Sequence, residues 1–194
     1  MTGEEIAQRI RLVARRFFAE LGYDGTDLKT IADAVGLSMA EVQSASGGKR
    51  ELYLRVFRDL VDEQAEFVAP AVAEFTQDLD GVIRLIDRYV FYNMENRELL
   101  ALWVQRWLSD AADFKEVERI FWAPPAEQLA DVMRPALRED VDVYPAIWMI
   151  VWSTYGFLTG GMLVEGAARL PPDSPEGRRR FLAQIHRYLA TLVP

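Results

Sequence analysis

Hydrophobic residues recur at steps of three and four along most of the chain, which is the spacing of one buried face of an α-helix. The first such face runs from Ile6 to Leu21. Thr2 and Glu5 ahead of it have the spacing of an N-terminal capping box, and Gly22 behind it is typical of a helix end. No stretch alternates between hydrophobic and polar residues for long enough to predict a β-strand. The pattern therefore predicts an all-α protein with about nine helices.

Two short helices are predicted directly after the first one. Residues 28–35 form one of them, capped by Thr26 or Asp27 and ended by Gly36. Ser38 caps the next helix, which has about two turns before a Gly-Gly pair breaks it. Two short helices joined by a glycine-containing turn, behind a longer helix, describe a helix-turn-helix module.

The rest of the chain is also helical by its hydrophobic spacing. The predicted segments are 49–68, 79–94, 99–107, 114–137 with an interruption by Ala-Pro-Pro at 123–125, 143–164 and 175–193. The proline-rich stretch 170–177 predicts a surface loop. We therefore expect a helix-turn-helix domain over residues 1–48 and a larger helical domain over residues 49–194.

Composition and charge narrow the class of protein. The chain has 194 residues, 51% of them hydrophobic, a formal net charge of −8, one histidine and no cysteine. It can bury a real core, whereas disulfides, thiolate metal sites and histidine metal clusters are excluded, so we expect no metal and no cofactor. Residues 1–55 carry eight basic and eight acidic side chains, so the net negative charge lies in the remainder. The charged N-terminus is unlike a secretory signal, and we expect a soluble, cytoplasmic protein.

The helix-turn-helix module carries a specific combination of residues within "FFAELGYDGTDLKTIADAVGLS" and the following "KRELYLRVF", over about residues 6–57. The matching positions are Phe18, Gly22, Tyr23, Thr26, Ile31-Ala32, Gly36-Leu37-Ser38, and Lys49 with Leu52. This combination resembles the N-terminal DNA-binding domain of the tetracycline-repressor (TetR) family of transcriptional regulators. The rest of the chain carries no family motif.

The resemblance implies a homodimeric transcriptional repressor that binds palindromic operator DNA and responds to a small-molecule ligand. It places the third helix in the major groove, while the larger domain dimerises and binds the ligand. By position in the family module, the residues expected to contact phosphate are Thr26, Lys29 and Lys49. Those expected to face the groove are Ser38, Met39, Ala40, Gln43 and Ser44.

The third helix departs from the family pattern. Family members usually show Gly-Thr-Leu-Tyr and then Phe three residues on, where this chain has Ala40-Glu41-Val42-Gln43 and Ser46. Loss of a buried Phe removes about 3 kcal/mol of packing unless other groups fill the space. A carboxylate at Glu41 is repelled by phosphate unless it accepts from a cytosine amino group, whereas Gln43 can read adenine. A second hypothesis therefore stays open, namely a helical small-molecule-binding dimer with weak or lost DNA binding.

Residues 143–164 form a run of 22 residues without charge, which is long enough for a membrane span. Pro145, three glycines and acidic flanks with little Lys or Arg favour instead a helix buried against other helices. Gly156 and Gly160 allow two backbones to approach closely. We therefore expect no membrane partner, and a homodimer that forms through 143–164 and 175–193 as a four-helix bundle.

Aromatic residues are concentrated in the C-terminal part, which contains all five tryptophans. Most of them are expected in the core, but many aromatics with interleaved polar side chains are also typical of a ligand cavity. The candidate lining residues are Tyr89, Asn93, Trp103, Gln105, Trp107, Trp122, Trp148, Trp152 and Tyr155. The expected ligand is a small hydrophobic or aromatic molecule.

The sequence offers little support for other chemistry. Residues 76–87 partly match a calcium-binding loop, but they lack its first Asp and its final Glu, and a capped helix explains them better. There is no nucleophile elbow, no glycine-rich phosphate loop and no Ser-His-Asp set. We therefore expect no catalytic residues and no enzyme activity.

Overall fold

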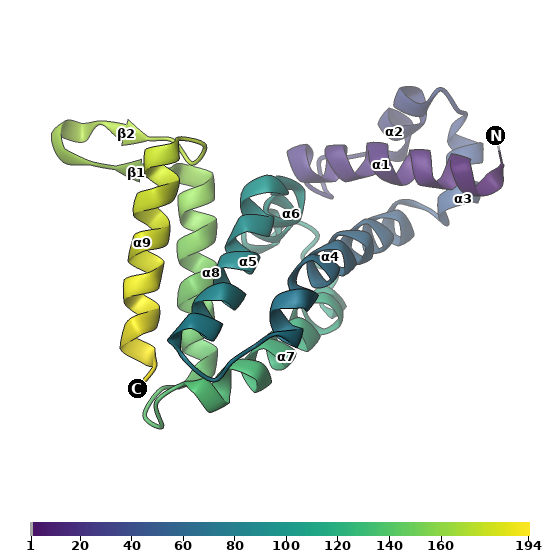
Figure 1. Cartoon of the computed structure of the whole chain (residues 1–194). Coiled ribbons are helices and arrows are strands. Elements are labelled where there is room, and N and C mark those ends of the chain that lie inside the picture. The colour runs from purple at the N-terminus through teal and green to yellow at the C-terminus, as the bar shows by residue number, and fades with distance from the viewer. Residues whose placement is uncertain (1) are drawn as a thin grey trace. The chain divides into compact units, whose positions relative to one another are not determined.

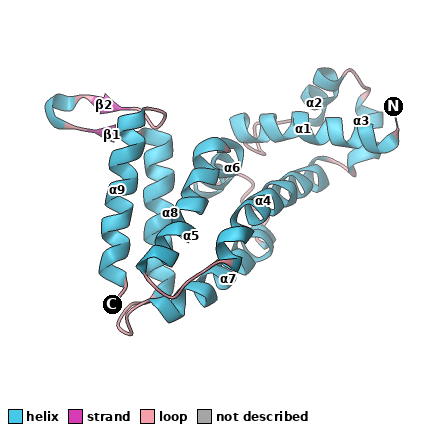
Figure 2. Cartoon of the chain, viewed as in Figure 1, coloured by secondary structure: helices cyan, strands magenta, loops and turns pink. Residues whose placement is uncertain are grey.

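The computed structural model describes residues 2–194, and within them the chain is almost entirely helical (Figures 1 and 2). The helices are α1 Gly3–Leu21, α2 Leu28–Val35, α3 Met39–Ser46, α4 Lys49–Ala73, α5 Leu79–Glu95, α6 Arg97–Trp107, α7 Ala123–Met133, α8 Val143–Gly160 and α9 Pro175–Leu192. A two-stranded antiparallel hairpin, β1 Met162–Leu163 and β2 Arg169–Leu170, links α8 to α9 and was not predicted. The all-α prediction and its nine helices are confirmed for the described residues.

Local hydrogen bonds explain where the N-terminal helices begin. The backbone N–H of Glu5 donates to the Thr2 hydroxyl at 3.2 Å, and the Glu5 carboxylate accepts from the Thr2 N–H at 2.7 Å, which is the predicted capping box. Asp27, one of the two alternatives for the second helix, is its N-cap and accepts from the Thr30 N–H at 2.7 Å.

Two differences from the predicted boundaries involve prolines. Helix α4 continues to Ala73 instead of ending at residue 68, and it contains Pro70, which has no N–H to donate to the carbonyl four residues earlier. The interruption expected at 123–125 is the start of α7, because Pro124 and Pro125 lie in a first turn whose N–H groups have no intrahelical partner. The break lies upstream, in turns over 108–113 and a π-helical turn over Glu118–Trp122.

The chain divides by its internal contacts into two compact units. Unit 1 extends to Glu63 and includes Arg97–Phe121, and unit 2 consists of Gln64–Asn96 and Trp122–Pro194. This division by packing differs from the functional division expected at residue 48, because α4 begins within unit 1 and α6 packs against α1.

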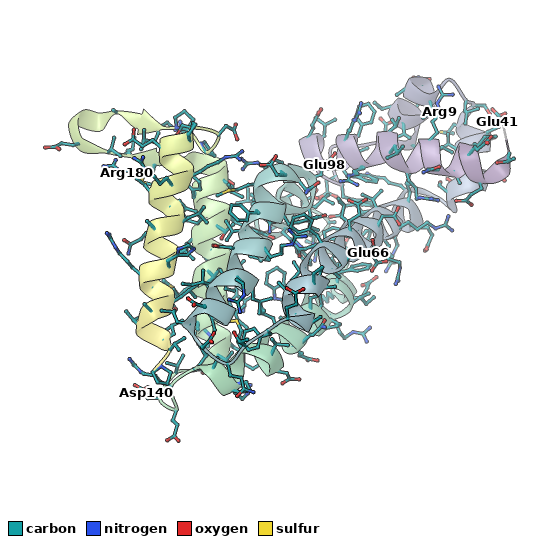
Figure 3. The ribbon with its side chains drawn as sticks, viewed as in Figure 1. Arg9, Glu41, Glu66, Glu98, Asp140 and Arg180 are labelled. Carbon is teal, nitrogen blue, oxygen red and sulfur yellow. The ribbon has the colours of Figure 1, made fainter. Side chains whose placement is uncertain are left out.

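An aromatic cluster forms the core of unit 1. Its members are Phe18, Tyr23, Tyr53, Phe57, Trp103, Phe114 and Phe121, which come from α1, α4, α6 and the segments that follow α1 and α6. The rings of Phe18 and Tyr53 meet edge to face with centroids 5.1 Å apart, a favourable aromatic geometry. Arg15 adds ion pairs from α1 to Glu63 at 2.7 Å and to Glu98 of α6 at 2.8 Å (Figure 3 labels Glu98).

Unit 2 is a bundle of α5, α7, α8, α9 and the end of α4. Helices α8 and α9 lie side by side, with the Phe157 and Phe181 rings stacked at 4.4 Å (Figure 1). The lone histidine, His186 of α9, lies 2.7 Å from the Asp87 carboxylate of α5. Among the helices that the structure describes, none is long and apolar enough to cross a membrane.

Candidate DNA-binding module and ligand site

The turn between α2 and α3 has the geometry of a helix-turn-helix. Gly36 adopts φ 68° and ψ 34°, in the left-handed region that favours glycine, and so ends α2. The Leu37 N–H then donates to the Ala32 carbonyl at 3.0 Å, and Ser38 begins α3 as its N-cap. Ile31 and Val42 are fully buried between the module's helices. The predicted module is therefore formed by α1, α2 and α3.

Glu41 has a structural role in α3 that the sequence comparison with the family did not reveal. Its carboxylate accepts from the Ser38 N–H at 2.8 Å and from the Ser38 hydroxyl at 2.7 Å. The Ser38 oxygen in turn accepts from the Glu41 N–H at 3.2 Å, which completes a second capping box. The hydrogen bonds from Ser38 lower the pKa of Glu41 below its ordinary value. Glu41 thus stabilises the start of α3 as an exposed, ionised cap.

Ser46 occupies the position where the family buries its Phe. Its side chain is buried, and its hydroxyl donates to the Val42 carbonyl at 2.7 Å while accepting from the Gly48 N–H at 3.2 Å. A small polar side chain is tolerated here because the hydroxyl both donates and accepts a hydrogen bond. The module thus closes around serine instead of an aromatic ring.

Thr26 does not fit its expected role as a phosphate contact. It is 1% exposed, and its hydroxyl donates to the Gly22 carbonyl at 2.7 Å and lies 3.2 Å from the Phe17 carbonyl. A hydroxyl has a single hydrogen, so none is left for a phosphate oxygen. The Thr26 N–H is also used, by the Tyr23 carbonyl at 3.2 Å. The prediction is therefore corrected, because Thr26 joins the end of α1 to the start of α2.

The other predicted DNA-facing residues lie at or near the surface of the module. Lys29, Ser38, Met39, Ala40, Gln43 and Ser44 are exposed, and Lys49 is partly exposed. The Ser38 hydroxyl is occupied in the capping box. The Gln43 amide lies beside Gly48, where an added Cβ would approach its Nε2 to 2.9 Å. The Lys49 ammonium lies 4.1 Å from the centroid of the Tyr23 ring, a cation–π contact that orients it.

The module has few cations, and acidic partners occupy two of the five in α1, α2 and α3, Arg11 and Arg15. Arg11 pairs with Glu4 and Asp59, and Arg50 pairs with Glu116. Within α1, α2 and α3 as the structure describes them, the exposed basic side chains that form no ion pair are Arg9, Arg16 and Lys29 (Figure 3 labels Arg9). Helix α3 itself contains no Lys or Arg. The module can therefore present only a small positive surface to phosphate.

Asp110 is a residue of the module's surroundings that sequence reasoning missed. Its carboxylate accepts from the backbone N–H groups of Tyr23 at 2.8 Å and Asp24 at 2.9 Å, directly after α1. The Ala111 N–H donates back to Asp24 at 3.3 Å. These contacts join positions 86 and 87 residues apart, so no local pattern could have indicated them.

The structure divides the nine candidate ligand residues between the two units. Trp103, Gln105 and Trp107 belong to unit 1, where Trp103 packs edge to face on Phe57 at 4.9 Å and Trp107 is 40% exposed. The other six, Tyr89, Asn93, Trp122, Trp148, Trp152 and Tyr155, belong to unit 2.

The six residues of unit 2 form two groups. Trp122, Trp148 and Trp152 make a ladder of rings with centroids 4.8 and 5.3 Å apart, and Trp152 is 53% exposed. In the other group, burial raises the pKa values of Tyr89 and Tyr155, whose phenols also affect each other across α5 and α8. Asn93 is fully buried and donates from Nδ2 to the Tyr89 carbonyl at 2.9 Å.

Similarity to known proteins is found among solved structures and not among curated sequences. No protein-family model matches the chain, and no curated protein sequence does either. Among solved structures, the ketosteroid transcriptional regulator KstR2 of Mycobacterium tuberculosis is similar with a TM-score of 0.71 and 17% identity, covering 97% of this chain and 95% of that one. The TetR-family regulator PfmR of Thermus thermophilus gives 0.71 and 20% identity, covering 94% and 97%.

A bacterial regulatory protein in the tetR family from Rhodococcus RHA1 is also similar, with a TM-score of 0.72 and 15% identity over 96% of each chain. These neighbours match nearly the whole length of this chain, although their sequences are far apart from it. The resemblance that the sequence showed over about residues 6–57 thus extends through the helices of the larger domain. The chain has the fold of the TetR-family transcriptional regulators.

Proposed function

We propose that the protein is a DNA-binding transcriptional regulator, a repressor, whose α3 enters the major groove of operator DNA. The observation that carries this proposal is the capped α2–turn–α3 module, with Met39, Gln43 and Ser44 exposed on one short helix. The structural neighbours, which are transcriptional regulators, support it. Gln43 is the residue that reads a base, since its amide can form a bidentate pair with adenine.

The regulator acts as a homodimer through α8 and α9, on a palindromic site. One side of α8 supports this, because Met149 is 47% exposed, Trp152 is 53% exposed, and an added Cβ at Gly156 or Gly160 would meet nothing within 4 Å. Exposed large apolar groups beside glycines suit close contact with an identical helix of a second copy. The two DNA-binding modules of the dimer then bind half-sites about one helical turn of DNA apart.

A small, largely apolar ligand binds in unit 2 and changes the affinity for DNA. The buried polar side chains of α5 and α8 within an apolar surround support a ligand site there. The ligand can change the DNA affinity only if it binds more tightly to one of two conformations of the regulator, one that binds DNA and one that does not.

Selection of binding sequences from random duplexes tests the function. The purified full-length chain is expected to enrich a palindrome at low salt. Absence of any enriched sequence at low salt would contradict DNA recognition and support the alternative, a ligand-binding dimer with weak or lost DNA binding. That alternative is favoured by one observation, the absence of Lys and Arg from α3.

Variants at Gln43 test whether this side chain contacts bases of the DNA. Gln43→Ala is expected to weaken binding to the selected palindrome more than binding to an unrelated duplex, because base contacts specify and phosphate contacts only position. Gln128→Ala, at an exposed position of α7, is the matched control and should change neither. Equal losses on both duplexes would show that Gln43 does not contact a base.

The salt dependence of binding follows from the small number of free cations. Each phosphate that a protein neutralises adds about 0.9 to the slope of log affinity against log salt. We expect a shallow slope for this protein. A slope as steep as that of a protein with eight or more phosphate contacts, measured by fluorescence anisotropy, would contradict the proposed interface.

A further inference from the structure

Unit 2 contains a group of buried polar atoms without hydrogen-bond partners among the described residues. They are Gln64 Nε2 of α4, the Tyr89 hydroxyl and Asn93 Oδ1 of α5, and Thr154 Oγ1 of α8. Asn93 and Thr154 are 0% exposed. Folded proteins leave few such atoms unpaired, because each one forfeits its hydrogen bonds to water. Four within one helical bundle therefore require a specific explanation.

The helices that carry these atoms meet around aromatic residues. The Phe67 ring, one turn along α4 from Gln64, packs on the Tyr92 ring of α5 with centroids 5.6 Å apart. Tyr155, which follows Thr154 on α8, interacts electrostatically with the phenols of Tyr89 and Tyr92 on α5. The unpaired atoms thus belong to elements that pack on one another within unit 2.

The buried part of unit 2, as far as the structure describes it, is mostly apolar and contains no charged residue. The buried residues of unit 2 on α5, α7 and α8 include Val82, Val90, Met133, Ile147, Ile150 and Leu158. Within the described part of unit 2, no Asp, Glu, Lys, Arg or His is buried. A charged group placed there would lose its hydration and find no counter-charge.

We propose that unit 2 binds an uncharged, largely apolar molecule that carries a hydroxyl or similar group, with Asn93 Oδ1 and Thr154 Oγ1 as its hydrogen-bond partners. This inference rests on the proposed ligand site and gives its chemical class. Asn93 Nδ2 is held by the Tyr89 carbonyl, so Oδ1 is the side-chain atom left to accept a hydrogen bond. Thr154 Oγ1 can both donate and accept, so the pair suits a group that does the same.

Three probes of one shape test the class of ligand at pH 7. They are 2-naphthol, which is neutral and has a hydroxyl, naphthalene, which has no polar group, and 2-naphthoate, which is an anion. Equilibrium dialysis against the full-length chain is expected to show that 2-naphthol binds at least tenfold more tightly than 2-naphthoate. Tighter or equal binding of 2-naphthoate, or no binding of any probe, would overturn the proposal.

Two variants test the two hydrogen-bond partners. Thr154→Val keeps the side-chain volume, Asn93→Leu keeps the branched shape, and each is expected to weaken 2-naphthol binding about fivefold while leaving naphthalene unchanged. Thr159→Val is the matched control, because Thr159 is exposed on the same helix and should affect no probe. Equal effects on 2-naphthol and naphthalene would overturn the assignment of Asn93 and Thr154.

The fold of each variant and the DNA function are checked separately. Thermal unfolding of Thr154→Val should show no loss of stability, because the change removes an unpaired buried oxygen. The dialysis contains no DNA, so a failure here alongside an enriched palindrome refutes the ligand class and leaves the regulator intact. Binding of 2-naphthol without any enriched palindrome refutes the regulator and leaves the ligand class intact.

Discussion

Replacing Thr26 by valine distinguishes a structural residue from a DNA contact. Valine has nearly the shape of threonine, so no cavity forms, and only the hydroxyl is lost. That hydroxyl donates to the Gly22 carbonyl at 2.7 Å, and Thr26 is only 1% exposed. We therefore expect Thr26→Val to lower the stability of the fold and to leave DNA binding by the folded protein unchanged.

The magnitude follows from the single lost hydrogen bond. A neutral hydrogen bond contributes about 1 kcal/mol net, and a buried carbonyl left without a donor adds to the loss, so we expect about 1–2 kcal/mol. For a chain of this length, 1 kcal/mol corresponds to about 2–4 °C in the unfolding midpoint. The midpoint of Thr26→Val should therefore fall by about 2–8 °C.

Urea and thermal unfolding measure the stability change, and fluorescence anisotropy with the selected palindrome well below the midpoint measures the DNA affinity. Thr30→Val is the matched control, because its residue is exposed and its hydroxyl donates to Asp27 at 3.1 Å. It should change the stability by less than about 0.5 kcal/mol. An unchanged midpoint for Thr26→Val together with a tenfold loss of DNA affinity would refute the structural role and restore the phosphate contact.

Three further predictions concern α3, the helix caps and the dimer. Ser46→Phe, which restores the family's aromatic residue, should destabilise the chain by about 1–3 kcal/mol in urea unfolding because the site has closed around serine, and an unchanged or raised midpoint would show that space remains. Hydrogen bonds lower the pKa values of Asp27 and Glu41, so their ionised caps stabilise α2 and α3 above the ordinary carboxylate pKa. That stabilisation is lost as the pH falls through the lowered pKa values. Amide hydrogen exchange, corrected for the intrinsic exchange rate, measures it, and equal protection of α2 and α3 at neutral and acid pH would contradict the prediction. Gly156→Leu should dissociate the proposed dimer in sedimentation equilibrium, whereas Gly3→Leu, at another glycine where an added Cβ meets nothing within 4 Å, should not. An intact Gly156→Leu dimer would place the interface elsewhere.

Residue patterns predicted part of the candidate DNA-binding site. The positions of Lys29, Gln43 and Ser44 on exposed helical surface were predictable, because helical periodicity separates them from Ile31 and Val42. The burial of Thr26 was not predictable, since a threonine before a helix is equally suited to face solvent or to bond a carbonyl of the preceding turn. The same holds for the candidate ligand residues, whose division between two units depends on which helices pack together.

The sequence by itself determined the features that depend on neighbours within four residues. The capping box of Thr2 and Glu5, the end of the second helix at Gly36 and the N-cap at Ser38 were all predicted, because their hydrogen bonds span only a few positions. The capping box of Ser38 and Glu41 has the same spacing, and comparison with the family pattern obscured it.

Only the tertiary structure decided the features that depend on residues far apart in the chain. Asp110 accepts from the backbone beside Tyr23, and Arg15 pairs with Glu63 and Glu98, across separations of 48 to 87 residues. Such contacts depend on how the helices pack, and packing is a property of complementary shapes that hydrophobic spacing does not encode. The unpaired polar atoms of Asn93 and Thr154 are of the same kind, because burial decides whether an ordinary helical Asn or Thr lacks a partner.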